Sequence, residues 1–129
     1  GSPLAMAAGL WSLSRLSKDL YARLARLGEQ LAVGLADAAR VVGVPLQVNA
    51  VGSALTPFFA AKPARDYHSA LAANSMQYAA FFRAMLSQGV YAPPSQFEAW
   101  FLSAAHTEAD VRKTIRAAKG AMREAVEAV

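Results

Sequence analysis

One carboxylate, Glu98, stands among aromatic side chains in the segment QFEAWF and is the first residue of this chain that could do chemistry. Phe97 and Trp100 lie within two residues of it, and Gln96 is the other strongly polar side chain nearby. Two interpretations are open. Glu98 is either exposed on one face of a strand, the common case, or held in a poorly hydrated place. Desolvation there would raise its pKa and make it a candidate site residue.

The remaining ionisable residues form no recognisable catalytic or metal-binding pattern. His68 has no cysteine, acidic cluster or second histidine at ligand spacing, and His106 directly precedes a helix start, where a structural role is expected. A glycine-rich phosphate loop and paired carboxylates at catalytic spacing are missing from the sequence. The lysines lie on polar helix faces or in a loop, not in settings that depress a lysine pKa for covalent catalysis: Lys18, Lys62, Lys113 and Lys119.

The composition fits one domain with a core of closely packed helices. The chain has 129 residues, 55% of them hydrophobic and many of these alanine. Charged residues make up 17%, against about 25% in an average domain, so part of the surface is expected to be covered by something outside this chain. The net charge of +4 is scattered, which argues against a nucleic-acid interface, and cysteine is absent, which excludes a disulfide framework. No apolar run reaches the roughly 18 residues of a membrane span.

The first half of the chain predicts two helices followed by a hairpin. Helices are expected over Pro3–Leu16, capped by Ser2, and over Ser17–Val42, where Gly43 ends the apolar stripe. Strands are expected at 46–50 and 54–60 because apolar and polar residues alternate in the first and a glycine turn separates the two. Pro57 indicates an edge position or a bulge in the second strand.

The second half predicts helix, strand and helix. A short helical turn over 66–73 contains His68, and a helix over 75–88 begins with Asn74 and Gln77 in the spacing of a capping box. A third strand is expected over 97–105, and Thr107 with Asp110 opens a final helix that runs to residue 129. The predicted fold is α+β: a small, mainly antiparallel sheet of about three strands with helices packed on one face.

Three blocks of the sequence resemble the C-terminal region of the glutamate-1-semialdehyde 2,1-aminomutases, a family of class III aminotransferases with fold type I. The blocks are PLAMAAGL, LQVNAVGSALTPFF and GVYAPPSQFEAWFLSAAHTEADV. Their order and spacing match that region along essentially the whole chain. The first block is shared loosely with other class III aminotransferases, whereas the last is more specific to the aminomutases.

The resemblance implies a parent enzyme that isomerises glutamate 1-semialdehyde to 5-aminolevulinate in tetrapyrrole (porphyrin) biosynthesis. That enzyme is expected to be a cytoplasmic homodimer that uses pyridoxal 5'-phosphate and pyridoxamine 5'-phosphate and needs neither nucleic acid nor a membrane. The family's cofactor lysine and phosphate ligands lie upstream, in the large catalytic domain. This chain alone is therefore expected to hold no catalytic, cofactor-binding or metal-binding residue, to bind no cofactor and to be inactive.

The resemblance also implies a domain organisation. Residues 1–2, Gly-Ser, are typical of an expression scar, residues 3–16 would form a helix joining to the missing large domain, and residues 17–129 would form the C-terminal small domain. The chain is accordingly expected to be a piece of a longer protein.

One functional position carries over from the family. Glu98 matches the acid of the family's QFEA block, which implies that it faces the active-site entrance and orients or retains the amine-bearing intermediate. Ser95 and Gln96 flank it and are expected to shape the same wall. Two alternatives remain: the small domain of another class III aminotransferase, and a stand-alone interaction module that binds a partner through the apolar face of Leu4, Ala8 and Trp11.

Overall fold

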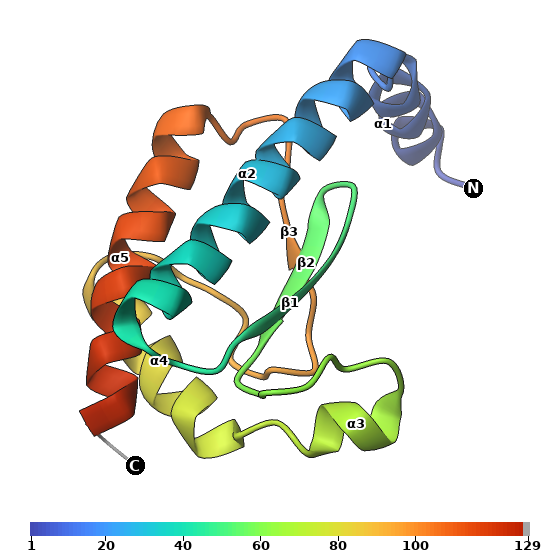
Figure 1. Ribbon diagram of the computed structural model, residues 1–129. Helices are drawn as coiled ribbons and strands as arrows, with labels where there is room; N and C mark the ends of the chain where they lie inside the picture. The colour runs from blue at the N-terminus through green and yellow to red at the C-terminus, as the bar shows by residue number, and fades with distance from the viewer. Residues whose placement is uncertain (128–129) are drawn as a thin grey trace.

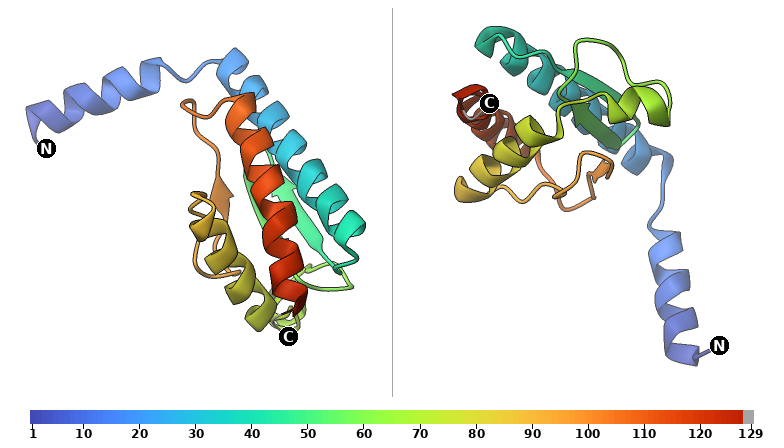
Figure 2. Two further views of the ribbon diagram at one scale, coloured as in Figure 1. Left: turned by 90° about the vertical axis from the view of Figure 1, so that its left-hand side faces the viewer. Right: turned by 90° about the horizontal axis from the view of Figure 1, so that it is seen from below.

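Three helices cover one face of a three-stranded sheet in the computed structural model, which describes residues 1–127 (Figures 1 and 2). The helices are α2 (Lys18–Val42), α4 (Ser75–Ser87) and α5 (Glu108–Glu127). The sheet holds β1 (Gln47–Val51), β2 (Ala54–Phe58) and β3 (Trp100–Phe101) in that order, and both neighbouring pairs are antiparallel. Two further helices, α1 (Pro3–Ser14) and α3 (Tyr67–Leu71), lie outside the helix layer. The predicted α+β class with its one-sided helix layer is confirmed.

Local capping residues set most helix boundaries where the sequence predicts them. The Ser17 hydroxyl accepts a hydrogen bond from the Leu20 amide at 3.1 Å, so α2 begins one residue after its predicted cap. Gly43 ends α2 in the left-handed region at φ +83°, where a residue with a Cβ would be strained. The Asn74 side chain accepts hydrogen bonds from the two amides that follow Ser75 and starts α4.

The cap of α5 is a reciprocal pair. The Asp110 carboxylate accepts hydrogen bonds from the Thr107 amide at 2.8 Å and the Thr107 hydroxyl at 2.7 Å, and the Asp110 amide donates to that hydroxyl. This confirms the capping box predicted from the sequence. These hydrogen bonds, with smaller contributions from His106 and Lys113, lower the pKa of Asp110 below its ordinary 3.8. The last two predicted helical residues, 128 and 129, lie outside the described part of the chain.

Asp110→Asn is expected to destabilise the fold in a pH-dependent way. Because the folded pKa of Asp110 is lowered, its contribution is present above the unfolded value of 3.8 and is lost as the pH falls through the folded pKa. The melting temperature of the variant should therefore fall below that of the parent chain at pH 7, and the gap should close below pH 3.8. Glu108→Gln is the matched control, because it also removes a first-turn charge of α5 but leaves the capping box intact. A gap that stays constant with pH would contradict the argument.

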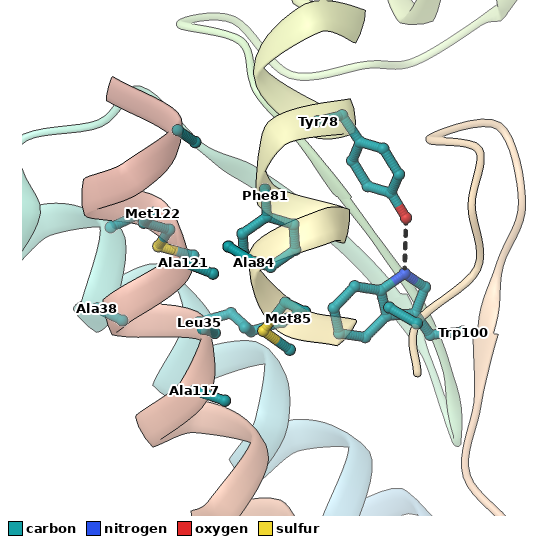
Figure 3. Packing of buried hydrophobic residues seen from close by; sticks show 14 of the residues in the cluster. Leu35, Ala38, Tyr78, Phe81, Ala84, Met85, Trp100, Ala117, Ala121 and Met122 are labelled. Carbon is teal, nitrogen blue, oxygen red and sulfur yellow. Dashed lines mark hydrogen bonds between the residues drawn. The ribbon is translucent and has the colours of Figure 1, made fainter. Parts of the chain in front are cut away.

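The core lies between the helix layer and the sheet. Leu27, Leu31 and Leu35 form the buried stripe of α2, as their spacing predicts. Phe81 and Met85 of α4 belong to the same cluster, and Met85 lies beside Leu35 (Figure 3). Five buried alanines and one methionine let α5 pack closely on both α2 and α4: Ala117, Ala118, Ala121, Ala125, Met122 and, from α4, Ala84. The sheet adds Leu55 and Trp100 to the same cluster. The apolar stripes predicted from the sequence are therefore largely buried, except at Met76 of α4 and Val126 of α5, which are 68% and 47% exposed.

The position of Pro57 is not the one predicted. Its strand, β2, is the central strand of the sheet, not an edge, and it pairs with β1 through all five of its residues. Its ladder with β3, however, includes only Ala54 and Leu55. Pro57 lies beyond that short ladder, so the absence of its amide proton removes no hydrogen bond to β3.

The third strand is much shorter than the predicted 97–105. A turn replaces its beginning, because the Ser95 carbonyl accepts a hydrogen bond from the Glu98 amide at 3.1 Å. A second turn replaces its end, where His106 Nδ1 accepts a hydrogen bond from the Ser103 amide at 2.9 Å. From α2, Arg23 donates to the carbonyls of Ala104 and His106 at 3.1 and 2.7 Å and fixes this second turn. His106 thus has the structural role that its position indicates.

Candidate functional site

Glu98 lies in an exposed turn directly before β3. The turn is closed by the Glu98 amide and by the Phe97 amide, which donates to the Ser95 hydroxyl at 3.2 Å. On its other side, the Glu98 carbonyl accepts a long hydrogen bond of 3.5 Å from the Thr56 hydroxyl of β2. Of the two environments considered for this carboxylate, the exposed one is observed. It occurs in a turn, however, and not on a strand.

The turn borders the face of the sheet that the helix layer leaves open. The strand register places Asn49 and Val51 of β1, Ala54 and Thr56 of β2, and Phe101 of β3 on this side, which we call the open sheet face. Val51 is 83% exposed and Phe101 73% exposed. A shallow, largely apolar hollow of about 190 Å³ runs along β1 and β2 and reaches Ala99, the neighbour of Glu98. Exposed apolar side chains beside a carboxylate are typical of a surface that another protein element covers.

Aromatic side chains extend this surface on the far side of the turn. The rings of Phe97 and Tyr67 lie 6.4 Å apart, although Tyr67 belongs to α3. The exposed fractions are 52% for Phe97 and 68% for Tyr67. His68 follows Tyr67 and is also exposed. The structure thus brings α3 next to the Glu98 turn, a neighbourhood that the sequence analysis did not identify.

The two residues that flank Glu98 in the candidate wall have different environments. Ser95 is half-buried and forms the turn through its hydroxyl and carbonyl. Gln96 is only 3% exposed, and its side-chain amide donates to the Ala73 carbonyl at 3.4 Å. Its Oε1 atom is buried and has no hydrogen-bond partner among the described residues. Gln96 therefore anchors the turn to the joint between α3 and α4 and does not line the exposed surface.

A second hollow, of about 130 Å³, lies between β3 and the start of α5. Trp100 and Val111 supply apolar walls, while His106 and Asp110 lie at its polar side. Both polar side chains already accept structural hydrogen bonds: His106 from the Ser103 amide in the turn after β3, and Asp110 from the Thr107 amide in the cap of α5. The described residues contain no cluster of three or more side chains that could hold a metal ion.

The described residues do not fit a pyridoxal phosphate site by themselves. Lys18, Lys62 and Lys113 are exposed, and Lys119 is half-buried on α5, so none is enclosed beside a phosphate-binding loop. Local side chains already accept hydrogen bonds from the first amides of α2, α4 and α5, which could otherwise bind a phosphate. These lysines and these three helix starts therefore offer no ready site for a cofactor phosphate. Among residues 1–127, no helix is long and apolar enough to cross a membrane.

Tyr78 of α4 is a buried residue near the Glu98 turn, and its hydroxyl has a raised pKa. Burial raises the pKa of its hydroxyl, the Trp100 side chain opposes that effect, and the negative charge of Glu98 adds to it. Tyr78 is not among the site residues predicted from the sequence, because its hydroxyl partners, Pro93 and Trp100, are 15 and 22 residues away in the chain. An isolated tyrosine on a predicted apolar helix face carries no local signal for such contacts.

Comparisons with known proteins agree on one group of enzymes. The chain is 51% identical over 125 residues to the glutamate-1-semialdehyde 2,1-aminomutase of Anaeromyxobacter dehalogenans, a match that covers 97% of this chain and 29% of that protein. No family model matches the chain. This chain therefore spans less than a third of the length of that curated relative.

The solved structures give the same result for the fold. An omega-transaminase from Sphaerobacter thermophilus superposes with a TM-score of 0.90 at 26% identity, covering 98% of this chain and 29% of that chain. A glutamate-1-semialdehyde aminomutase from Pseudomonas aeruginosa, solved in complex with PMP, superposes with a TM-score of 0.74 over 84% of this chain and 24% of that chain. At 21% identity, this second likeness shows a shared fold only.

Proposed function

Because this chain is homologous along nearly its whole length to the C-terminal portion of the glutamate-1-semialdehyde 2,1-aminomutases, we propose that it works as the small domain of such an enzyme. The parent enzyme would isomerise glutamate 1-semialdehyde to 5-aminolevulinate for tetrapyrrole synthesis, as a cytoplasmic homodimer. The observation that carries the proposal is the 51% identity over 125 residues. When bound to the rest of the enzyme, the pyridoxal or pyridoxamine cofactor supplies the amino-group transfer.

The surfaces of this chain support a division into domains. Helix α1, with the linker up to residue 16, has no buried residue and extends away from the sheet (Figure 2). The helix itself, Pro3–Ser14, contains no charged side chain, and its Leu4, Leu10 and Trp11 are between 61% and 80% exposed. An isolated helix of 12 residues is marginal in water, so such a helix needs a partner. We assign residues 3–16 to the junction with the large catalytic domain and residues 17–129 to the small domain.

The open sheet face supports a place for Glu98 in that enzyme. If the large domain covers the apolar part of this face, the exposed carboxylate lies at the rim of the interdomain space. A carboxylate there can accept hydrogen bonds from the ammonium groups of substrate or diamine and hold them against escape. Ser95 shapes the turn that presents it. This chain's part in the reaction is therefore to orient and retain, while bond making and breaking occur on groups held elsewhere.

A domain exchange tests the proposal. In the A. dehalogenans aminomutase, this chain replaces the matching 125 residues, and we refer to the product as the chimera. The chimera is expected to form 5-aminolevulinate from glutamate 1-semialdehyde, whereas the 129-residue chain alone should form none. A folded chimera that only exchanges amino groups with keto acids would favour another class III aminotransferase. Borohydride fixation of pyridoxal phosphate to one lysine of the isolated chain would contradict its expected inactivity.

The exposure of α1 also favours a second candidate, a stand-alone module that binds through Leu4, Ala8 and Trp11. On either proposal, the isolated chain is expected to self-associate, because its uncharged first helix has no partner in the fold. Trp11→Ser with Leu4→Ser should lower the association measured by sedimentation at micromolar concentration and should also lower hydrophobic-dye binding. Tyr21→Ser, at a 57% exposed site of α2, is the control and should change neither. A monomer without dye binding would show that α1 needs no partner and would count against both proposals for this helix.

A further inference from the structure

The Tyr78 hydroxyl joins the two ends of the segment that carries Glu98. It donates a hydrogen bond to the Pro93 carbonyl at 2.7 Å. It also accepts one from Trp100 Nε1 at 3.2 Å (Figure 3). Pro93 directly precedes residues 94–99, and Trp100 directly follows them. One hydroxyl therefore closes this segment, which we call the Glu98 loop.

The position of that hydroxyl is fixed by the core. Tyr78 is 2% exposed, and its ring lies 6.1 Å from Phe81 and 6.3 Å from Phe59. Phe81 in turn stacks on Trp100, with ring centroids 6.2 Å apart and planes inclined by only 11°. Aromatic packing thus fixes the Tyr78 ring, and with it the point from which the hydroxyl reaches Pro93 and Trp100.

Inside the Glu98 loop, the remaining attachments are few. Gln96 donates to the Ala73 carbonyl, and Ser95 closes the local turn, while Thr56 reaches the Glu98 carbonyl only at 3.5 Å. The Glu98 side chain itself has no hydrogen-bond partner among the described residues and is exposed. Its direction consequently depends on how firmly the ends of the loop are held. The negative charge of Glu98 also contributes to the raised pKa of the Tyr78 hydroxyl, so the two groups interact electrostatically.

We propose that Tyr78 is a positioning residue for Glu98: its hydroxyl holds both ends of residues 94–99 and thereby fixes where the carboxylate lies at the domain interface. The inference rests on the function proposed above, in which Glu98 retains an amine-bearing species. Removing the hydroxyl leaves the Trp100 indole and the Pro93 carbonyl without this partner. The loop then samples more positions, and the carboxylate spends less time in the productive one.

A double-mutant cycle in the chimera tests the coupling. Tyr78→Phe retains the ring and is expected to lower kcat about fivefold. This factor corresponds to about 1 kcal/mol, the low end of what the loss of the hydroxyl's two hydrogen bonds would give. In the Glu98→Gln background the same change should lower kcat less than about 1.5-fold, because the group being positioned is already lost. Tyr91→Phe is the matched control. Tyr91 is 75% exposed, and its hydroxyl bonds to none of the described residues. Equal losses from Tyr78→Phe in both backgrounds would overturn the proposal and leave Tyr78 a core residue only.

Hydrogen exchange in the 129-residue chain tests the positioning without any activity. The Glu98 and Phe97 amides, both hydrogen-bonded within the loop, should exchange about fivefold faster in Tyr78→Phe, after normalisation to the core amides of α2. Unchanged normalised exchange overturns the positioning role. Faster exchange together with an unaffected Glu98→Gln chimera supports the loop closure and rejects the proposed role of Glu98, so the two failures are distinguishable. If Tyr78→Phe does not fold, Trp100→Phe removes one of the two bonds and keeps an aromatic ring against Phe81, and the same outcomes apply.

Discussion

Glu98→Gln in the chimera is expected to lower kcat roughly 10- to 100-fold while leaving KM within about a factor of three. The change keeps the size of the side chain and removes its charge, so it tests charge alone. A glutamine cannot neutralise an ammonium group, and an amine-bearing species should then escape from the site more often. Steady-state formation of 5-aminolevulinate gives kcat, and released diamine, measured in the same reaction, should increase.

The structure indicates that Glu98→Gln should affect activity without affecting the stability of the fold. Glu98 is exposed, and its attachments to the protein run through its backbone amide and carbonyl, which the substitution retains. The free energy of unfolding should therefore change by less than about 0.5 kcal/mol. Glu108→Gln provides the control, since Glu108 is an exposed acid of α5 that pairs only with Arg112 among the described residues. Kinetics of Glu98→Gln indistinguishable from those of Glu108→Gln would remove Glu98 from the site.

Gly28→Ala is expected to destabilise the fold by about 3 kcal/mol, a large fraction of the 5–15 kcal/mol typical of a domain. Gly28 is a buried residue in the middle of α2 that packs against the turn of the β1–β2 hairpin. A Cβ there would overlap the Gly52 carbonyl oxygen and lie 3.4 Å from the Ser53 Cα. Both contacts are with backbone, so the hairpin would have to move away from the helix. The gain of about 1 kcal/mol in helix propensity is too small to offset this.

Gly120→Ala provides the comparison within α5. The nearest atom to its added Cβ is the end of the Gln88 side chain at 3.3 Å, which can rotate away. We expect the free energy of unfolding of this variant, measured by urea denaturation, to lie within about 0.5 kcal/mol of that of the parent chain or slightly above it, because helix propensity then dominates. If Gly28→Ala were as stable as Gly120→Ala, the close approach of α2 to the hairpin turn would be wrong.

The sequence predicted those parts of the fold that depend on neighbouring residues. Ser17, Asn74 and the Thr107–Asp110 pair cap helices because their partners lie two or three positions away. Gly43 ends α2 for an equally local reason. Ser2 is the exception. It precedes α1 but makes no side-chain cap, and the helix ends at Ser14, two residues short of the predicted end.

Errors arose where distant residues decide the structure. The strand expected over 97–105 has only two residues in the structure. At its beginning, the Glu98 amide bonds to Ser95 in a turn, and at its end, Arg23 of α2 binds the Ala104 carbonyl. The prediction of an edge position or a bulge at Pro57 was wrong, because β2 is central and in continuous register with β1, and the shortness of β3 has no signal in the local sequence. In the candidate site, Glu98 was identified from its motif, whereas the burial of Gln96 and the loop closure by Tyr78 depend on contacts across 23 and 15 residues.

The two tryptophans of this chain lie in opposite environments. Trp100 is 7% exposed inside the core, whereas Trp11 is 61% exposed on α1, beneath the Arg15 guanidinium at 4.5 Å. The intrinsic fluorescence of the protein therefore has two separable sources. Emission from Trp11 should shift to shorter wavelength and resist iodide quenching when α1 becomes covered, while that of Trp100 should respond only to unfolding. With Trp11→Phe as the reference, one spectrum reports domain docking and domain integrity without an added label.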